Sequence, residues 1–194
     1  MAKPTSARED LIETAVELFR ARGYEGVGVA ELLQKSGAPR GSLYFHFPGG
    51  KEQIGAEAVA RVGAEVEARF RELRESNVDL DTYVDRVFKY TAKEVKEREY
   101  HASCPMAAIA AEFSSAHGPN LHAAVRNAFN AWQREIALAA QERGMAAKNA
   151  EIFASAMLTA MEGAFIVSKA QVSPAAHLNA ARAIKALASA LLAH

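Results

Sequence analysis

The chain of 194 residues carries 23 Lys and Arg against 23 Asp and Glu, so its formal net charge is zero, and half of its residues are hydrophobic. This apolar content excludes a disordered chain, because there is enough apolar surface to offset the entropy of ordering. The zero net charge excludes nucleic-acid binding through a general positive excess, so any such site must be a local patch.

Helical periodicity runs through the chain, and no stretch shows the period-two alternation of a strand. The sequence therefore predicts an all-α protein of about nine helices. The first helix starts near Ser6, which has capping-box spacing to Glu9, and it ends at Gly23. An apolar stripe on this helix is formed by Ile12, Val16 and Phe19, with Leu11, Ala15 and Leu18 beside them.

Two short helices are predicted next, with a glycine turn between them. The first covers about 29–36, with Ala30 and Leu33 facing inward, and Gly37 supplies its left-handed stop. The second begins at Pro39, where a missing N–H costs nothing, and continues to about residue 47. With the first helix they predict a compact three-helix head.

Longer helices are predicted over most of the remaining chain. Their expected ranges are 51–74, 80–98, 105–115, 121–143 and 152–172, and the last helix follows Ser173 as N-cap and Pro174 as its first residue.

The two short helices and their glycine turn have the order of a helix-turn-helix motif. No acidic residue occurs from Leu32 to Lys51, whereas Lys35, Arg40 and His46 lie within that window. An acid-free surface suits a polyanion, because a misplaced carboxylate would repel phosphate. The pattern alone leaves open a helical hairpin in a core whose basic edge is accidental.

The second short helix begins with residues suited to reading DNA. Arg40 can bind guanine with two hydrogen bonds, and Gly41 beside Ser42 allows a close backbone approach. Tyr44 and His46 can donate to phosphates and so fix the register on the duplex.

A specific array of residues runs through 11–54. It comprises Ala15-Val-Glu-Leu-Phe19, Gly23-Tyr24, Val29-Ala30, Gly37, Gly41-Ser-Leu-Tyr44, His46-Phe47 and Lys51-Glu52. This array resembles the N-terminal domain of the TetR family of transcriptional regulators. The longer spacer from Pro48 to Lys51, with Ala38-Pro39 and Cys104-Pro-Met106, resembles the LmrA/YxaF-like branch, whose members repress drug-efflux genes.

The resemblance implies a helix-turn-helix DNA-binding domain over 1–51, with the recognition helix, 39–45, in the major groove. Two positions depart from the family pattern. Gly28 stands where Ser or Thr usually caps the second helix, and Phe45 stands where relatives often carry His or Trp. The resemblance assigns Arg40, Gly41 and Ser42 to the bases, places Phe45 on the same DNA-facing helix, and assigns Tyr44, His46 and Lys51 to phosphates, with Lys51 at the start of the fourth helix.

The resemblance also implies a ligand-binding and dimerisation domain over 52–194. The last two helices would form a four-helix homodimer interface, and two heads would bind a palindromic double-stranded operator. A small lipophilic effector would release the repressor and so control efflux or detoxification genes. The candidate effector residues are Phe88, Met106, Phe113, Phe129, Trp132, Met157, Met161 and Phe165; the same residues also suit plain core packing.

Other features concern location and competing chemistry. The only cysteine, Cys104, excludes an internal disulfide and fits either a buried small hydrophobe or a redox sensor. Neither a leader peptide nor a run of about 18 uncharged apolar residues is apparent, so a cytoplasmic protein without membrane contact is expected.

Three rival interpretations remain. His101, Cys104, His117 and His122 mimic zinc-finger spacing, but the segment lacks the expected strands, and no metal or cofactor is predicted. An enzyme is not expected, because neither a nucleophilic triad nor a glycine-rich phosphate loop is present. The third interpretation is a helical interaction module whose head has lost DNA binding. The basic residues of the head disfavour it.

Overall fold

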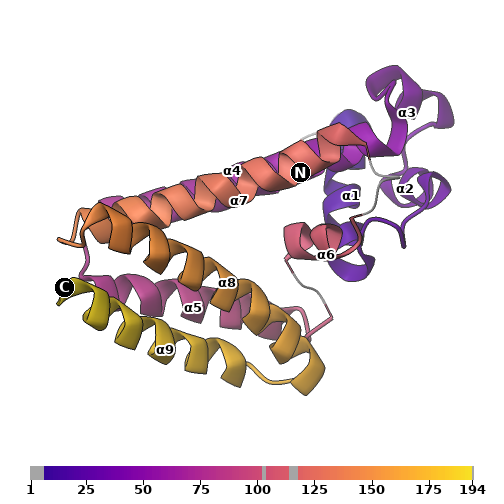
Figure 1. The fold of residues 1–194 in the computed structure, drawn as a ribbon. Coiled ribbons are helices and arrows are strands. Elements are labelled where there is room, and N and C mark those ends of the chain that lie inside the picture. The colour runs from indigo at the N-terminus through magenta and orange to yellow at the C-terminus, as the bar shows by residue number, and fades with distance from the viewer. Residues whose placement is uncertain (1–6, 102–103, 114–117, 194) are drawn as a thin grey trace. The chain divides into compact units, whose positions relative to one another are not determined.

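The computed structural model describes residues 7–101, 104–113 and 118–193, and within them it contains nine α-helices and no strand (Figure 1). The predicted all-α architecture is therefore confirmed. Ser6 and the expected end of the sixth helix near residue 115 lie outside the described residues. The helices are α1 (Ala7–Arg22), α2 (Val29–Ser36), α3 (Arg40–His46), α4 (Gly50–Glu75), α5 (Leu80–Glu97), α6 (Pro105–Ala111), α7 (Pro119–Gln141), α8 (Ala147–Gln171) and α9 (Ala175–Leu192).

Glycines close several of these helices, as the sequence predicts. Gly23 after α1 has φ +72°, Gly37 after α2 has φ +68° and Gly144 after α7 has φ +92°. This left-handed conformation closes a helix C-terminus, and glycine adopts it without the steric cost that a Cβ would bring. The positions of these helix ends are therefore determined by single residues and can be predicted from the sequence.

Two local predictions are wrong. In α2, Leu32 is the fully buried residue, whereas Ala30 is exposed and Leu33 only half-buried, so the inward face is displaced from the predicted one. At α9 the N-cap is Pro174 rather than Ser173. The Ser173 hydroxyl instead accepts a hydrogen bond from the amide two residues later, at 3.3 Å.

The helices form two compact units, each built from separate stretches of chain. The first comprises residues 1–64 and 104–128, and the second comprises 65–103 and 129–194. In the first unit, α1 packs against α2, α3 and α6. The core of this unit includes Leu11, Ile12, Ala15, Leu18, Phe19, Leu32, Leu43 and Phe47.

The second unit is centred on α8, which packs along α9, while α5 contacts both helices (Figure 1). An 18-residue window of α8 has mean hydropathy 1.5, so its length and composition would suit a membrane span. Its apolar residues are used differently here, because Phe153, Met157, Leu158 and Phe165 are buried within the unit. In this unit α8 is therefore a core helix.

The packing does not divide at residue 51. The sequence places a DNA-binding domain at 1–51 and a regulatory domain at 52–194, whereas the first unit also takes in residues 52–64 and 104–128. The functional division stays a prediction, and it differs from the division by packing.

Among the described residues, four polar side chains are buried in the second unit, those of Thr91, Glu135, Ser168 and His177. The carboxylate of Glu135 on α7, only 4% exposed, pairs with Arg74 at 3.0 Å and Arg71 at 3.4 Å, both from α4. His177 on α9 is fully buried, and its Nδ1 lies 2.9 Å from the Ser168 hydroxyl of α8. Burial lowers the pKa of His177 to about 4, so the ring is neutral at pH 7.

Candidate nucleic-acid interface

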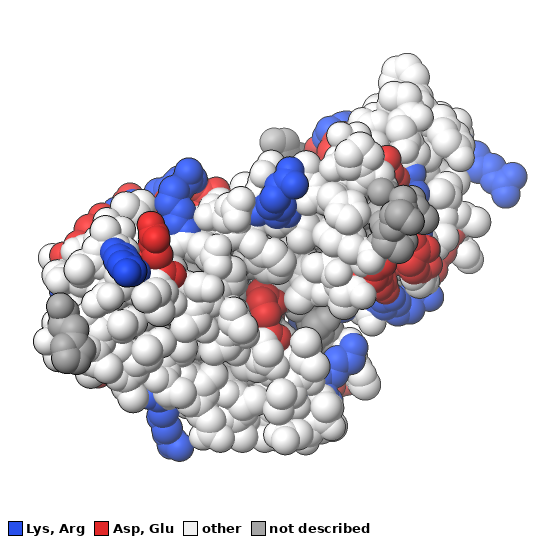
Figure 2. Space-filling model, viewed as in Figure 1, with Lys and Arg blue, Asp and Glu red and all other residues white. Residues whose placement is uncertain are grey.

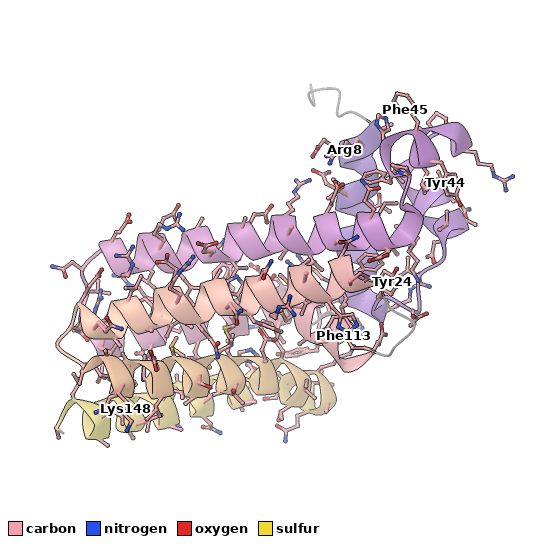
Figure 3. All side chains as sticks on the ribbon, turned by 45° about the horizontal axis from the view of Figure 1, so that its top comes forward. Arg8, Tyr24, Tyr44, Phe45, Phe113 and Lys148 are labelled. Carbon is pink, nitrogen blue, oxygen red and sulfur yellow. The ribbon has the colours of Figure 1, made fainter. Side chains whose placement is uncertain are left out.

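The helix α3 is anchored on one side and open to solvent on the other. Leu43 and Phe47 are fully buried, four residues apart on one face, and the Phe47 amide donates to the Leu43 carbonyl at 2.7 Å. The side chains of Tyr44 and Phe45 are 63% and 80% exposed, and Figure 3 shows them on the outside of the head. One α-helix therefore presents a free face, as a recognition helix requires.

The start of α3 leaves the backbone accessible. Gly41 is exposed, and a Cβ built on it would meet nothing within 4 Å. Arg40 is exposed and makes no ion pair among the described residues. The Ser42 hydroxyl donates to the Pro39 carbonyl at 2.7 Å, which leaves its lone pairs for a donor on a base. These three residues lie on one turn of helix, as predicted.

The charges near α3 are less available than the sequence suggests. Lys35 on α2 pairs with Glu31 at 3.5 Å, and Glu31 also pairs with Arg22 of α1. In Figure 2 the top of the head is white, so uncharged side chains cover the part of it that this view shows. The head therefore offers an acid-free helix with aromatic side chains at its tip and few free cations.

The predicted phosphate ligands His46 and Lys51 are both partly buried. The ammonium of Lys51 lies 4.0 Å from the centre of the Tyr24 ring, a cation–π contact. Burial lowers the pKa of Lys51, while the carboxylates of Glu25 and Glu112 oppose this shift. The His46 ring stands edge-on to Phe45 with centroids 5.0 Å apart. The phosphate contact of Lys51 stays a prediction.

A carboxylate from the end of α6 binds the turn after α1. Oε2 of Glu112 accepts hydrogen bonds from the amides of Tyr24 at 2.6 Å and Glu25 at 2.9 Å. A Cβ on Gly23 would stand 1.9 Å from Oε1 of this carboxylate, so the turn has room for it only because residue 23 is glycine. We call this arrangement the Glu112 clasp.

A second carboxylate makes a similar contact at the start of α7. Oε1 of Glu52 on α4 accepts from the Asn120 amide at 3.1 Å, and a Cβ on Gly118 would come within 2.0 Å of it. Neither contact was found from the sequence, because the partners are 88 and 68 residues apart. A glycine at a helix end predicts a turn and says nothing about a distant side chain that fills the space.

The predicted effector residues fall into both units. Met106 and Phe113 belong to the first unit, and the other six belong to the second. Phe88, Met106, Trp132 and Met157 are fully buried, which agrees with the core-packing alternative. Within the second unit, Phe129 stands edge-on to Trp132 with centroids 5.5 Å apart. Their role in effector binding stays a prediction.

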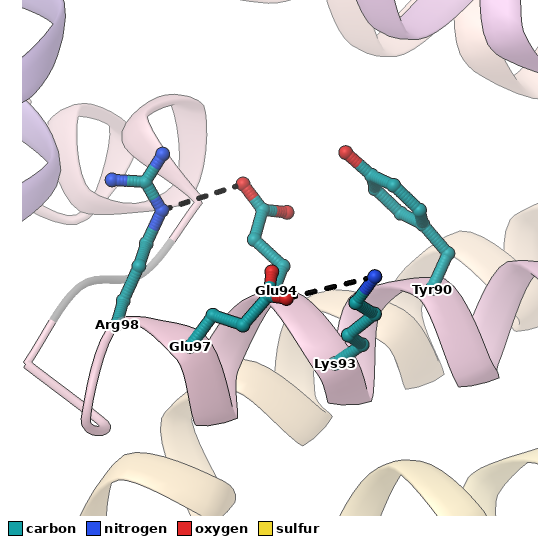
Figure 4. A pocket seen from close by; sticks show the side chains of 5 residues that line it. All are labelled: Tyr90, Lys93, Glu94, Glu97 and Arg98. Carbon is teal, nitrogen blue, oxygen red and sulfur yellow. Dashed lines mark ion pairs between the residues drawn. The ribbon is translucent and has the colours of Figure 1, made fainter.

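One surface pocket of about 260 Å³ lies along α5 in the second unit (Figure 4). Its lining contains none of the predicted effector residues. The four charged side chains that line the pocket form two ion pairs, Lys93 with Glu97 at 3.6 Å and Arg98 with Glu94 at 3.7 Å. Tyr90 is the remaining lining residue. The internally balanced charges make this pocket a poor match for a lipophilic molecule.

The described residues give no support to a redox role for Cys104 or to a zinc site. Cys104 is buried at the start of α6, as expected of a small hydrophobe. Of the zinc-like set, His117 lies outside the described residues, and His122 stacks on Phe113 with centroids 3.8 Å apart. The metal-site hypothesis therefore stays untested.

Comparison with protein families gives two matches, one in the N-terminal part of the chain and one covering about half of it toward the C-terminus. Residues 11–58 match the model for bacterial regulatory proteins of the tetR family. Residues 82–183 match the model for the C-terminal domain of LmrA/YxaF-like transcriptional regulators.

Individual proteins agree with these matches. The chain is 29% identical to the uncharacterized HTH-type transcriptional regulator YxaF of Bacillus subtilis, over 87% of each chain. It is also 29% identical to the HTH-type transcriptional regulator LmrA of the same organism, over 84% of this chain and 86% of LmrA. A cysteine mutant of the TetR family regulator CifR, solved with 26-base-pair operator DNA, shares the fold at a TM-score of 0.76, with 20% identity over 98% of this chain and all of that one.

Proposed function

Because the chain belongs to the TetR family of transcriptional regulators, with an LmrA/YxaF-like C-terminal domain, we propose that it is a ligand-responsive repressor of efflux or detoxification genes. The observation that carries this proposal is the open face of α3, which exposes Arg40, Gly41, Tyr44 and Phe45 while Leu43 and Phe47 anchor it. The cytoplasm, where operator DNA lies, is the proposed location.

The proposed roles follow from the geometry of α3. Arg40 reads a guanine edge with two N–H donors, and Ser42, whose O–H is given to Pro39, accepts from a donor on a neighbouring base. Gly41 lets the helix backbone approach the groove. Tyr44, with an exposed phenol, donates to a phosphate, and His46 and Lys51 do the same at the edge of the contact.

A homodimer through α8 and α9 completes the DNA-binding unit, because seven residues of α3 offer too few donors for a specific site alone. Apolar side chains remain exposed on these two helices and support the proposal. They are Ile152, Ile166, Val167 and Val172 from α8 and the turn after it, and Leu178 and Leu192 from α9. Burying them against a second copy removes apolar surface from water and pairs two heads on a palindrome.

The proposed effector is a small lipophilic molecule bound among the aromatic and Met side chains of the C-terminal domain. It acts by preferring a conformation in which α4 holds the head differently, since a ligand shifts an equilibrium only through a difference in affinity. By linkage, operator DNA weakens effector binding by the same factor that effector weakens DNA binding.

A titration of the full-length protein against its own upstream region tests the proposal. Fluorescence anisotropy at a stated salt concentration should show tight binding, and the double variant Arg40→Ala/Tyr44→Ala should bind only as weakly as random DNA. If the upstream region fails, a selection from random duplexes is the second arm. Failure of both arms, with ligand-free protein of native helicity, would leave the interaction module as the function.

The effector arm uses the same assay. Lipophilic cations and planar aromatic drugs are titrated into the protein–DNA complex, and a binding molecule should lower the anisotropy. If molecules that demonstrably bind the protein leave its DNA affinity unchanged, the ligand-responsive part of the proposal is wrong.

A further inference from the structure

The ring of Phe45 is the most exposed large apolar side chain in the described residues, at 80%. It belongs to α3 and stands out from the head into solvent (Figure 3). A phenylalanine has no hydrogen-bonding group, so it can contribute to recognition only through apolar contact. Its exposure on a seven-residue helix therefore calls for an apolar partner.

The helical geometry shows that Phe45 cannot serve the core of the head. Leu43 and Phe47 are fully buried and lie two residues before and after it. At about 100° per residue, two residues are just over half a turn, so Phe45 lies opposite the anchored face. The His46 ring stands edge-on to the Phe45 ring, with centroids 5.0 Å apart. The Phe45 ring thus points where DNA would dock.

The major groove has one apolar group on its floor, the C5-methyl of thymine. The donors and acceptors on that edge cannot be satisfied by a phenyl ring, and the remaining C–H groups are smaller and less exposed than the methyl. We propose that Phe45 reads thymine by packing its ring against this methyl group, as a specificity-determining residue. The inference rests on the DNA-binding function proposed above.

The neighbouring residues allow such a contact. Gly41, one helical turn before Phe45, has no side chain and nothing within 4 Å of its Cβ direction, so the helix can approach the base edges closely. The absence of carboxylates from Leu32 to Lys51 removes repulsion from the phosphates on either side. Tyr44 differs from Phe45 because its hydroxyl can donate a hydrogen bond to a phosphate.

The experiment compares duplexes that differ only in the methyl group. A duplex is first selected by the full-length protein from a random pool and is then synthesised with thymine or with uracil, which pairs identically but lacks the C5-methyl. The dissociation constants of both are measured by anisotropy at one salt concentration. Uracil should weaken binding about fourfold for each methyl covered, and about fifteenfold when both heads of a dimer cover one.

Two variants identify the residue responsible. Phe45→Ala, at an exposed position, should bind the thymine duplex as weakly as the uracil duplex, so that the ratio of the two constants falls to one. The matched control Tyr44→Phe keeps its ring and loses its hydroxyl, so it should weaken binding to both duplexes and keep the ratio.

The outcomes separate this inference from the proposed function. Tight binding with a thymine-to-uracil ratio of one, or a wild-type ratio that persists in Phe45→Ala, overturns the inference and leaves DNA binding intact. A protein that enriches no duplex from the pool refutes DNA binding and the inference with it. Single thymine-to-uracil changes should place the effect at one symmetric pair of positions.

Discussion

The Glu112 clasp gives the sharpest stability test in this protein, through the substitution Gly23→Ala. Residue 23 has φ +72°, a conformation that costs a residue with a Cβ about 1–2 kcal/mol. The new Cβ would also stand 1.9 Å from Oε1 of Glu112, so the carboxylate must swing away. It then loses its hydrogen bonds to the amides of Tyr24 and Glu25.

The magnitude follows from these two effects. Hydrogen bonds to a charged group contribute about 1.5–3 kcal/mol each, and the lower value applies here because the Glu25 amide is exposed, which gives about 3 kcal/mol for both. Gly23→Ala should therefore cost about 4–5 kcal/mol in the free energy of unfolding. Glu112→Ala should cost about 3 kcal/mol, since it removes the same hydrogen bonds without the strain.

The double variant isolates the clasp. Because the hydrogen bonds can be lost only once, Gly23→Ala/Glu112→Ala should cost about 4–5 kcal/mol, which is about 3 kcal/mol less than the sum of the single changes. Urea unfolding followed by far-ultraviolet circular dichroism measures all three. The matched control is Gly37→Ala, which has a similar φ of +68° and no atom within 4 Å of its Cβ, so strain alone should act.

Two results would refute this reasoning. Additive single and double variants would mean that Glu112 does not occupy the space beside Gly23. Equal costs for Gly23→Ala and Gly37→Ala would mean that backbone strain is the whole effect.

Further predictions concern the second unit. The folded pKa of His177, about 4, lies below the unfolded value near 6.5, so its contribution to stability is present above pH 6.5 and is lost as pH falls toward 4, by up to about 2.5 kcal/mol at pH 4.5. Urea midpoints at pH 7 and 4.5 should show this loss in the parent and a smaller one in His177→Phe; equal losses would contradict it. Arg74→Ala should cost about 3 kcal/mol because it strips the buried Glu135 of its nearest cation. Glu142→Ala, which removes a half-exposed partner of Arg74, should cost less than about 1 kcal/mol in the same urea assay, and equal costs would show that Glu135 is not the partner that matters. Ile166→Asp, on a side chain 64% exposed, should give a helical monomer by light scattering, whereas a dimer of unchanged mass would exclude that part of α8 from the interface.

The helical architecture was predictable because the residues that end its helices act locally. The glycines after α1, α2 and α7 mark helix ends through their own backbone freedom, and the predicted range of α2, 29–36, matches the structure. The exposed face of α3 could also be inferred, since the apolar Leu43 and Phe47 recur at helical spacing. These signals need no knowledge of what packs against them.

What failed depends on packing between distant segments. The rotation of α2 is fixed by its contact with α1, so Leu32 rather than Ala30 is buried, although both positions fit a helix. The contact of the Lys51 ammonium with the ring of Tyr24, a residue from a separate loop, also has no signal in the sequence, and the phosphate contact of Lys51 stays a prediction. The contact of Glu112 with a turn 88 residues earlier has no counterpart in any short pattern.

The interleaving of the first unit has a practical consequence for anyone building hybrid sensors from this protein. Residues 104–128 belong to the same packed body as residues 1–64, and the boundaries with the second body fall inside α4, just before α6 and inside α7. A chimera made by one cut after the helix-turn-helix would part the turn at Gly23 from the carboxylate that fills it. Exchange of specificity between relatives therefore calls for grafting both stretches of chain together, with two crossovers inside α4 and α7, where the helical register can be kept, and a third before α6.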